Sequence, residues 1–118
     1  MQRGDVILVD LDSPISQVGH VQTGRRYAVV ISNDQIIPSI SVITVVPLTS
    51  KDSALRRYPN TIEISPNVYN GLQEKSYALI VQVQTIDRLR ILELSGHLEQ
   101  EVLNKIDQKL IEYLIRNS

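Results

Sequence analysis

The 118-residue chain contains no cysteine, no tryptophan and no phenylalanine, and it has only two histidines. Without cysteine, the chain can form no disulfide, no Cys-based zinc site and no thiol nucleophile, and a reducing compartment is allowed. Two histidines are too few for a typical structural zinc site. Any chemistry that the chain performs must therefore come from its hydroxyl, amide and charged side chains or from its histidines acting singly.

The chain also lacks a strong excess of charge of one sign, because its formal net charge is −1 and its isoelectric point is about 6.1. Affinity for nucleic acid must then come from a local patch, which argues against a nonspecific DNA coat. No apolar run approaches the length of a membrane span, and the N-terminal MQRGDVILVD lacks the apolar region of a signal peptide. We expect a soluble, cytoplasmic protein that makes no membrane contact.

What is present is an ordinary globular composition, with 42% hydrophobic and 21% charged residues. Such a composition argues against disorder and against a coiled coil. The length suits one domain, spanning residues 1–118, and we find no internal repeat or linker.

Short β-branched runs bounded by turn residues predict that most of the chain is β-strand. The predicted strands are Val6–Leu11, Ala28–Ile31, Ile40–Leu48, Thr61–Ile64, Tyr77–Thr85 and Leu92–Leu98. Pro47 fits only near the end of its strand or on a sheet edge. Residues 36–38 are expected to be helical or irregular, residues 51–60 to form a polar, basic loop, and His97 to belong to a turn.

Only the last segment has helical periodicity. Its apolar residues, from Val102 to Ile115, recur at spacings of three and four, and its charged residues occupy the opposite side. Short strands followed by one long helix, without βαβ alternation, predict a mainly β fold with α: a small antiparallel barrel or an α+β fold.

The stretch Gly24–Asn33, GRRYAVVISN, contains two adjacent arginines that lead into an apolar run typical of a strand buried on both faces. Gly24 relaxes the backbone just before this run. Guanidinium groups at the edge of a strand suit a phosphate, because the planar fork matches two oxygens at once. The commoner alternative is that both are solvated arginines that flank a core strand.

Five blocks of the chain, in order, resemble the MazF/PemK family of toxin endoribonucleases: RGDVILVDLD, TGRRYAVVISND, VITVVPLTS, GLQEKSYALIVQVQTIDRLR and the late GHL. The resemblance implies an SH3-like (PemK/CcdB-type) barrel with a C-terminal amphipathic helix, a homodimer, and cleavage of single-stranded RNA, such as mRNA, without a metal or organic cofactor. It also implies a cognate antitoxin whose acidic C-terminal tail occupies the RNA groove, with DNA contacted only through that antitoxin.

The family's catalytic arginine and threonine fall on Arg26 and Thr49. Attack of a 2′-hydroxyl on the adjacent phosphate builds negative charge on the phosphorane oxygens, and a fixed cation with a hydroxyl donor stabilises that charge. Such a reaction leaves a cyclic phosphate and a 5′-hydroxyl, and it cannot act on DNA, which has no 2′-hydroxyl.

Two positions that are acidic in many family members are Val21 and Val81 here, so the group that transfers the proton must lie elsewhere. We hypothesise that His20 acts as general base or acid beside Arg26, because the unperturbed pKa of histidine lies near neutrality. The alternative is that His20 is a solvent-exposed loop residue.

The candidates for RNA binding are Gln22, Gly24, Arg25, Asn33, Ser50, Arg56, Arg57 and Gln82, of which Asn33 and Gln82 match family positions that line the RNA groove. Amides such as those of Asn33 and Gln82 can read base edges, but they can equally cap a turn or satisfy a strand. Arg25, Lys51, Arg56 and Arg57 would track phosphates, although a charged loop is more often only solvated. Most of the five tyrosines are expected to be structural.

Two other functions remain open on the sequence. With both acidic positions replaced by valine, the same barrel could bind RNA or a protein partner without efficient catalysis. The related gyrase-poison branch of this fold depends on a C-terminal tryptophan segment, whereas this chain has no tryptophan and ends in Ile115-Arg116-Asn117-Ser118.

Overall fold

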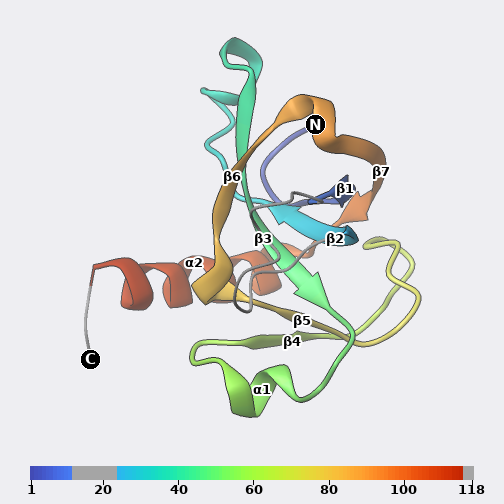
Figure 1. Ribbon diagram of the computed structural model, residues 1–118, viewed down its shortest axis with the longest axis vertical. Coiled ribbons are helices and arrows are strands. Elements are labelled where there is room, and N and C mark those ends of the chain that lie inside the picture. The colour runs from blue at the N-terminus through green and yellow to red at the C-terminus, as the bar shows by residue number, and fades with distance from the viewer. Residues whose placement is uncertain (12–23, 116–118) are drawn as a thin grey trace.

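A computed structural model describes residues 1–11 and 24–115 and shows a curved antiparallel sheet followed by one long helix (Figure 1). The strands are β1 (Asp5–Asp10), β2 (Arg25–Val30), β3 (Val42–Thr49), β4 (Ile62–Ile64), β5 (Ser76–Ala78), β6 (Gln84–Asp87) and β7 (Ile91–His97). The α-helices are α1 (Ala54–Arg57) and α2 (Gln100–Leu114), and the 3₁₀ turns are η2 (Ile37–Ser39), η3 (Ile80–Gln82) and η4 (Arg88–Arg90).

The seven strands form one antiparallel sheet, in which six lie in the order β4-β5-β3-β2-β1-β7 and β6 lies off this path, paired with β3. β3 has the most partners, because one of its sides pairs with β2 and its other side pairs first with β6 and then with β5. The mainly β, antiparallel fold with a C-terminal helix that the sequence predicted is confirmed.

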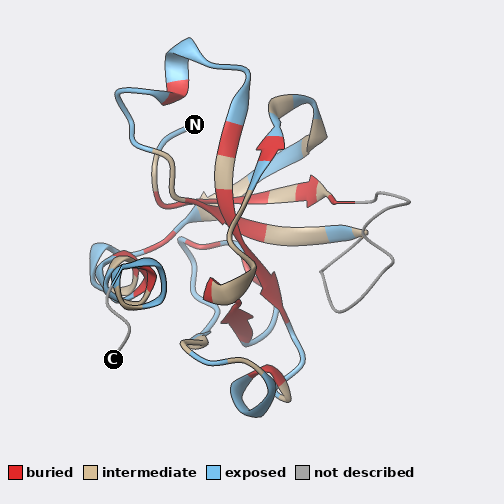
Figure 2. Cartoon of the chain, turned by 60° about the vertical axis from the view of Figure 1, so that its left-hand side comes forward, coloured by how far each residue is buried: buried red, intermediate tan, exposed pale blue. Residues whose placement is uncertain are grey.

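Most of the buried residues, red in Figure 2, lie in the central strands and belong to two apolar clusters, one on each face of the sheet. Val6, Val29 and Val46 on one face pack in a cluster with Ile106 and Leu110 of α2. The neighbouring residues of the same strands point the other way, into a second cluster that contains Ile7, Ala28, Val30 and Val45. Because both faces are covered, β2 needs a continuous apolar run and shows no alternation of polar residues. The predicted burial of Ala28–Ile31 is confirmed for its first three residues, which are fully buried, whereas Ile31 lies just past the end of β2 and is only partly buried.

Pro47 lies inside β3, where its missing N–H would normally break the sheet. Its carbonyl accepts a hydrogen bond from the Leu79 amide at 2.9 Å, so its nitrogen faces the same side of the strand. On that side β3 pairs with β6 as far as Val45 and with β5 from Leu48 onward, so its partner changes around Pro47. The proline therefore occupies the gap between two partner strands and costs no ladder hydrogen bond.

The prediction of one strand over Tyr77–Thr85 is wrong. The chain leaves β5 after Ala78, makes the η3 turn, and starts β6 at Gln84. The amides of Gln82 and Val83 donate to the carbonyls of Leu79 and Ile80, which closes the turn. A run of β-branched residues indicates that a segment is extended and buried, but it does not indicate where the neighbouring strand, here β3, changes its partner.

Two smaller predictions are corrected in the same way. Residues 51–60 are not all loop, because they contain the single turn of α1, in which the Tyr58 amide donates to Ala54. His97 is not in a turn but ends β7, where its Nδ1 lies 2.7 Å from the carboxylate of the buried Asp5. In the part of the chain that the structure describes, no helix is long and apolar enough to cross a membrane.

Candidate functional site

Arg26 and Thr49 lie at the adjoining ends of two paired strands. Arg26 is the second residue of β2 and Thr49 is the last residue of β3, and the two strands are antiparallel with Ala28 opposite Pro47. The paired part of the ladder ends at Ala28 and Pro47, and Arg26 and Thr49 each lie two residues beyond it, on the sides of the two strands that face the same end of the sheet. Both residues line the same two cavities. The structure therefore brings the two predicted catalytic side chains together.

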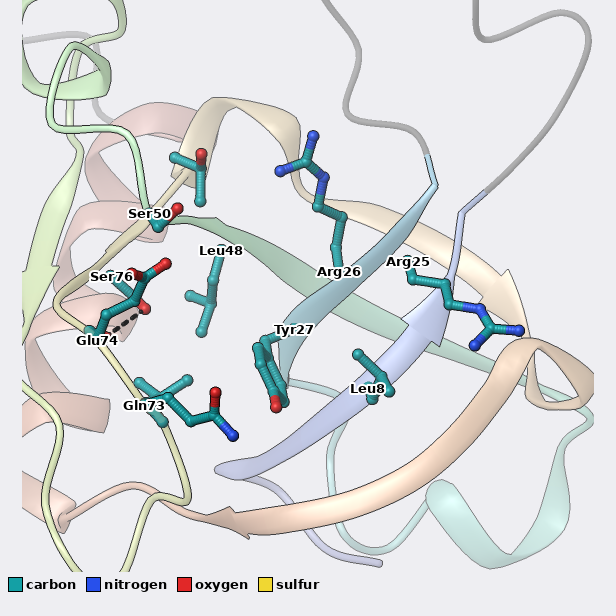
Figure 3. Close-up of a pocket in the computed structure, with 11 residues that line it drawn as sticks. Leu8, Arg25, Arg26, Tyr27, Leu48, Ser50, Gln73, Glu74 and Ser76 are labelled. Atoms are coloured by element: carbon teal, nitrogen blue, oxygen red, sulfur yellow. Dashed lines mark hydrogen bonds between the residues drawn. The ribbon is translucent and has the colours of Figure 1, made fainter.

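The larger cavity, which we call the strand-end cavity, has a volume of about 270 Å³. Arg25 and Arg26 supply positive charge, and Figure 3 shows their guanidinium groups pointing in different directions, as expected of neighbours on a strand. The apolar part of the lining is Leu8, Tyr27, Leu48 and Leu72. The polar part is Thr49, Ser50, Gln73, Glu74 and Ser76.

The smaller cavity, which we call the basic cavity, has a volume of about 80 Å³ and shares Arg26 and Thr49 with the first. Its other charged lining residues are Lys51 and Arg57, the second of which is held in place by α1. The uncharged part of the lining is Ser53, Ala54 and Tyr58. Arg56 borders a neighbouring hollow together with Ser53 and Arg57. A phosphate between the two cavities would meet cations from β2, from α1 and from the segment that joins β3 to α1.

The Thr49 hydroxyl is buried and oriented. The residue is 6% exposed, and its Oγ1 accepts a hydrogen bond from the Lys51 amide at 3.3 Å. A hydroxyl has one proton to donate in addition to its acceptor lone pairs. The backbone amide occupies one acceptor site of the oxygen, and the hydroxyl keeps its proton for donation to a group bound in the cavity.

The structure places the other predicted residues as follows. Gly24 has a φ of 77°, so it makes the left-handed entry to β2 that glycine allows best. Arg25 and Ser50 line the strand-end cavity. His20 and Gln22 lie outside the described residues.

Asn33 and Gln82 line neither cavity. Asn33 lies beyond the far end of β2, where its side-chain oxygen accepts a hydrogen bond from the Gln35 amide at 2.8 Å. Gln82 ends η3, a turn that contacts α2. The contribution of both residues to RNA binding stays a prediction.

Sequence reasoning missed the wall of the strand-end cavity that faces β2. Gln73 and Glu74 stand on that wall, opposite Arg26 and Tyr27 in Figure 3. They come directly before β5, and β5 pairs with the end of β3 through Tyr77 and Thr49. The segment reaches the site because of this pairing. The one feature of the sequence that could have indicated these residues is a polar run just before a predicted strand, but the sequence did not reveal the partner of that strand.

The loop that carries this wall is organised by the buried side chain of Asn70, which is 1% exposed. Its Oδ1 accepts hydrogen bonds from the amides of Asn67 at 3.1 Å and Leu72 at 3.0 Å, and its Nδ2 donates to the carbonyl of Ser65 at 3.0 Å. One side chain thus fixes both ends of the loop ahead of Gln73.

Replacing Asn70 with alanine should lower the free energy of unfolding by about 1–3 kcal/mol, because it leaves buried backbone groups without a partner. Urea unfolding followed by circular dichroism measures the loss. Asn104→Ala, on the exposed side of α2, is the control and should change stability much less. Equal stability of Asn70→Ala and the parent protein would mean that the loop does not depend on this residue.

Within residues 1–11 and 24–115, no three His, Asp or Glu side chains come together as ligands for a metal ion.

Comparison with known proteins gives one consistent result. A family model described as "PemK-like, MazF-like toxin of type II toxin-antitoxin system" matches residues 2–114. The chain is similar to Endoribonuclease EndoA of Bacillus subtilis, with 34% identity over 93% of this chain and 90% of the relative. It is also similar to Endoribonuclease MazF of Staphylococcus saprophyticus, with 35% identity over 99% of this chain and 97% of the relative. Among solved structures, MazF from Deinococcus radiodurans matches with a TM-score of 0.76 and 25% identity, over 97% of this chain and 96% of that chain.

Proposed function

We propose that this chain, which belongs to the PemK-like, MazF-like family of type II toxins, cleaves single-stranded RNA through attack of a ribose 2′-hydroxyl on the neighbouring phosphate. The chain is an endoribonuclease of the MazF type, like the curated relatives that it resembles along almost its whole length. Our proposal adds the chemistry of the cut and the residues that perform it. The observation that carries it is that Arg26 and Thr49 both line the same two cavities.

In this mechanism the scissile phosphate lies against Arg26 and Thr49. The guanidinium group and the threonine hydroxyl donate hydrogen bonds to the phosphate oxygens, whose negative charge grows as the 2′-oxygen attacks. The 5′-oxygen of the next nucleotide leaves, so the products carry a 2′,3′-cyclic phosphate and a 5′-hydroxyl. The cationic side chains supply the charge stabilisation, and no metal or organic cofactor takes part. Proton transfer by His20 stays a hypothesis.

The test is to incubate the purified protein with a long single-stranded RNA of mixed sequence in the presence of EDTA. We expect fragments with cyclic phosphate and 5′-hydroxyl ends, and no cleavage of DNA of the same sequence. Cleavage that stops when EDTA is added would refute metal independence. Binding of RNA without any cleavage would favour the alternative of a catalytically inactive binding module.

Replacing Thr49 with valine, which has nearly the same shape but no hydroxyl, should lower the rate of cleavage about tenfold to a hundredfold. A neutral donor stabilises the developing charge less than a guanidinium does, so we expect a smaller loss than for Arg26. The readout is single-turnover cleavage of one oligoribonucleotide, and Thr49→Ser should restore most of the rate. A Thr49→Val protein with the parent's rate would remove the hydroxyl from the mechanism.

As the toxin of such a system, the chain has an antitoxin as its partner, and we propose that an acidic segment of the antitoxin occupies the basic cavity. Lys51, Arg57 and Arg26 there suit carboxylates as well as phosphates, so the antitoxin would compete with RNA. Contact with DNA would then be made by the antitoxin.

We also propose that the chain forms a homodimer, because several apolar side chains of β7 and α2 are exposed, among them Leu94 at 57% and Leu114 at 62%. Measurement of the mass in solution tests the dimer.

A further inference from the structure

The two cavities that meet at Arg26 and Thr49 differ in charge. The basic cavity adds Lys51 and Arg57, and its described lining contains no carboxylate. The strand-end cavity adds Arg25 but also Glu74. Because a carboxylate repels a phosphate, the phosphates of a bound strand favour the shared wall and the basic cavity. The side of the strand-end cavity that Glu74 borders is left for an uncharged part of the nucleotide.

The lining near Glu74 suits a nucleobase. Leu8, Tyr27, Leu48 and Leu72 provide apolar and aromatic surface for the faces of a ring. Gln73 and Glu74 stand on the wall across from Tyr27 (Figure 3) and offer polar groups to the edge of that ring. An apolar surface for the ring, bordered on one side by polar groups for its edge, can select one orientation of a bound base.

Glu74 is held so that its carboxylate remains available. The Ser76 hydroxyl donates to the Glu74 carbonyl at 3.0 Å, and Leu72 is anchored in the core, which fixes the backbone on both sides. The Nζ atom of the adjacent Lys75 lies 3.7 Å from the Oε2 atom of Glu63 in β4, so this cation pairs with Glu63 and not with Glu74. In residues 1–11 and 24–115, no hydrogen bond or salt bridge engages the Glu74 carboxylate.

The geometry points to Glu74 as a specificity residue that recognises guanine next to the cleaved phosphate. An ionised carboxylate only accepts hydrogen bonds, and it can accept two in parallel. The Watson–Crick edge of guanine presents two adjacent donors, N1–H and the N2 amino group, whereas adenine and cytosine present one amino group and uracil presents one N–H. Guanine therefore forms the only paired, charge-assisted contact. This inference rests on the proposed endoribonuclease function.

The experiment compares cleavage of short single-stranded RNAs that differ at one nucleotide beside the cleaved bond. Mapping on a long mixed RNA first locates the cut, and the oligonucleotides then carry guanine, inosine, adenine or uracil at that position. The parent protein should cleave the guanine substrate about tenfold to a hundredfold faster than the inosine substrate, which lacks the 2-amino group. Glu74→Gln should reduce this ratio to near one, because an amide offers one acceptor and one donor. Glu101→Gln, an exposed change on α2, should leave the ratio unchanged.

Each outcome bears on the inference separately from the function. A parent protein that cleaves all four substrates equally would overturn guanine recognition while leaving the endoribonuclease intact. A Glu74→Gln protein that loses activity equally on all substrates would also overturn it, because Glu74 would then act in proton transfer or in folding. Absence of cleavage of any RNA by the parent protein, or full activity of Arg26→Ala, would instead refute the proposed function.

Discussion

The Arg26→Ala protein should cleave single-stranded RNA about a hundredfold to a thousandfold more slowly than the parent protein, with an unchanged fold. Arg26 and Thr49 both line the two cavities, and Arg26 is the one cation among their described lining residues that borders both. A fixed positive charge lowers the energy of the phosphorane more than that of the ground state, because the negative charge is larger there. The loss should therefore fall on the rate of the chemical step.

Single-turnover kinetics with excess protein separates that step from binding. Arg26→Lys keeps the charge but loses the planar fork, and we expect it to recover only part of the rate. Lys105→Ala removes an exposed cation of α2 and should behave as the parent. Circular dichroism and thermal unfolding of each variant exclude a loss of structure as the cause. An Arg26→Ala protein with the parent's rate would end the assignment of the site.

The fold was predictable wherever burial alone decides the structure. Ala28, Val29 and Val30 form a strand because each is fully buried between two apolar clusters, and a continuous apolar run is the direct record of that state. The periodic spacing of the last segment likewise gave α2, since Leu103, Ile106 and Leu110 are its buried residues. In both cases the spacing of the apolar residues along the chain indicates which face of the element is buried.

The pairing of strands was not predictable, and the misses follow from that. The run Tyr77–Thr85 is split because β3 exchanges one partner for another beside Pro47, and nothing in a run of apolar residues marks where a partner changes. His97 was placed in a turn because its partner, Asp5, lies 92 positions away in the chain. Long-range register depends on contacts that no local pattern encodes.

The site shows the same division. The family resemblance pointed to Arg26 and Thr49, and the antiparallel pairing of β2 with β3 brings the strand ends that carry them to the same two cavities. Glu74 was missed because its segment becomes part of the site only through the pairing of β5 with the end of β3. When a site is assembled from the ends of several strands, the sequence therefore reveals only the site residues that lie in recognised family motifs.

Gly71→Ala should lower the free energy of unfolding by about 3 kcal/mol or more, the largest effect on stability that we expect from a single methyl group. Gly71 has a φ of 68°, which is unfavourable for any residue with a side chain. A Cβ at this position would also overlap the backbone carbonyl of Ser95 in β7. Backbone atoms of a paired strand cannot move aside as a flexible side chain can, so strain and overlap add.

Gly4→Ala separates these two contributions. Gly4 also has a positive φ, of 92°, but the nearest neighbours of a Cβ there are side-chain atoms of Leu103 and His97. Gly4→Ala should therefore introduce only backbone strain and a small loss of packing, which lowers the free energy of unfolding by about 1–3 kcal/mol. Urea unfolding of both variants measures the difference, and equal losses would mean that β7 yields to the added methyl group. Because the loop that follows Gly71 carries Gln73 and Glu74, the close approach of Gly71 to β7 is also what holds this wall of the strand-end cavity in place. At a temperature where Gly71→Ala remains folded, the ratio of the cleavage rates of guanine and inosine substrates should therefore be lower than in the parent protein. The rate of cleavage itself, which depends on Arg26 and Thr49, should change less.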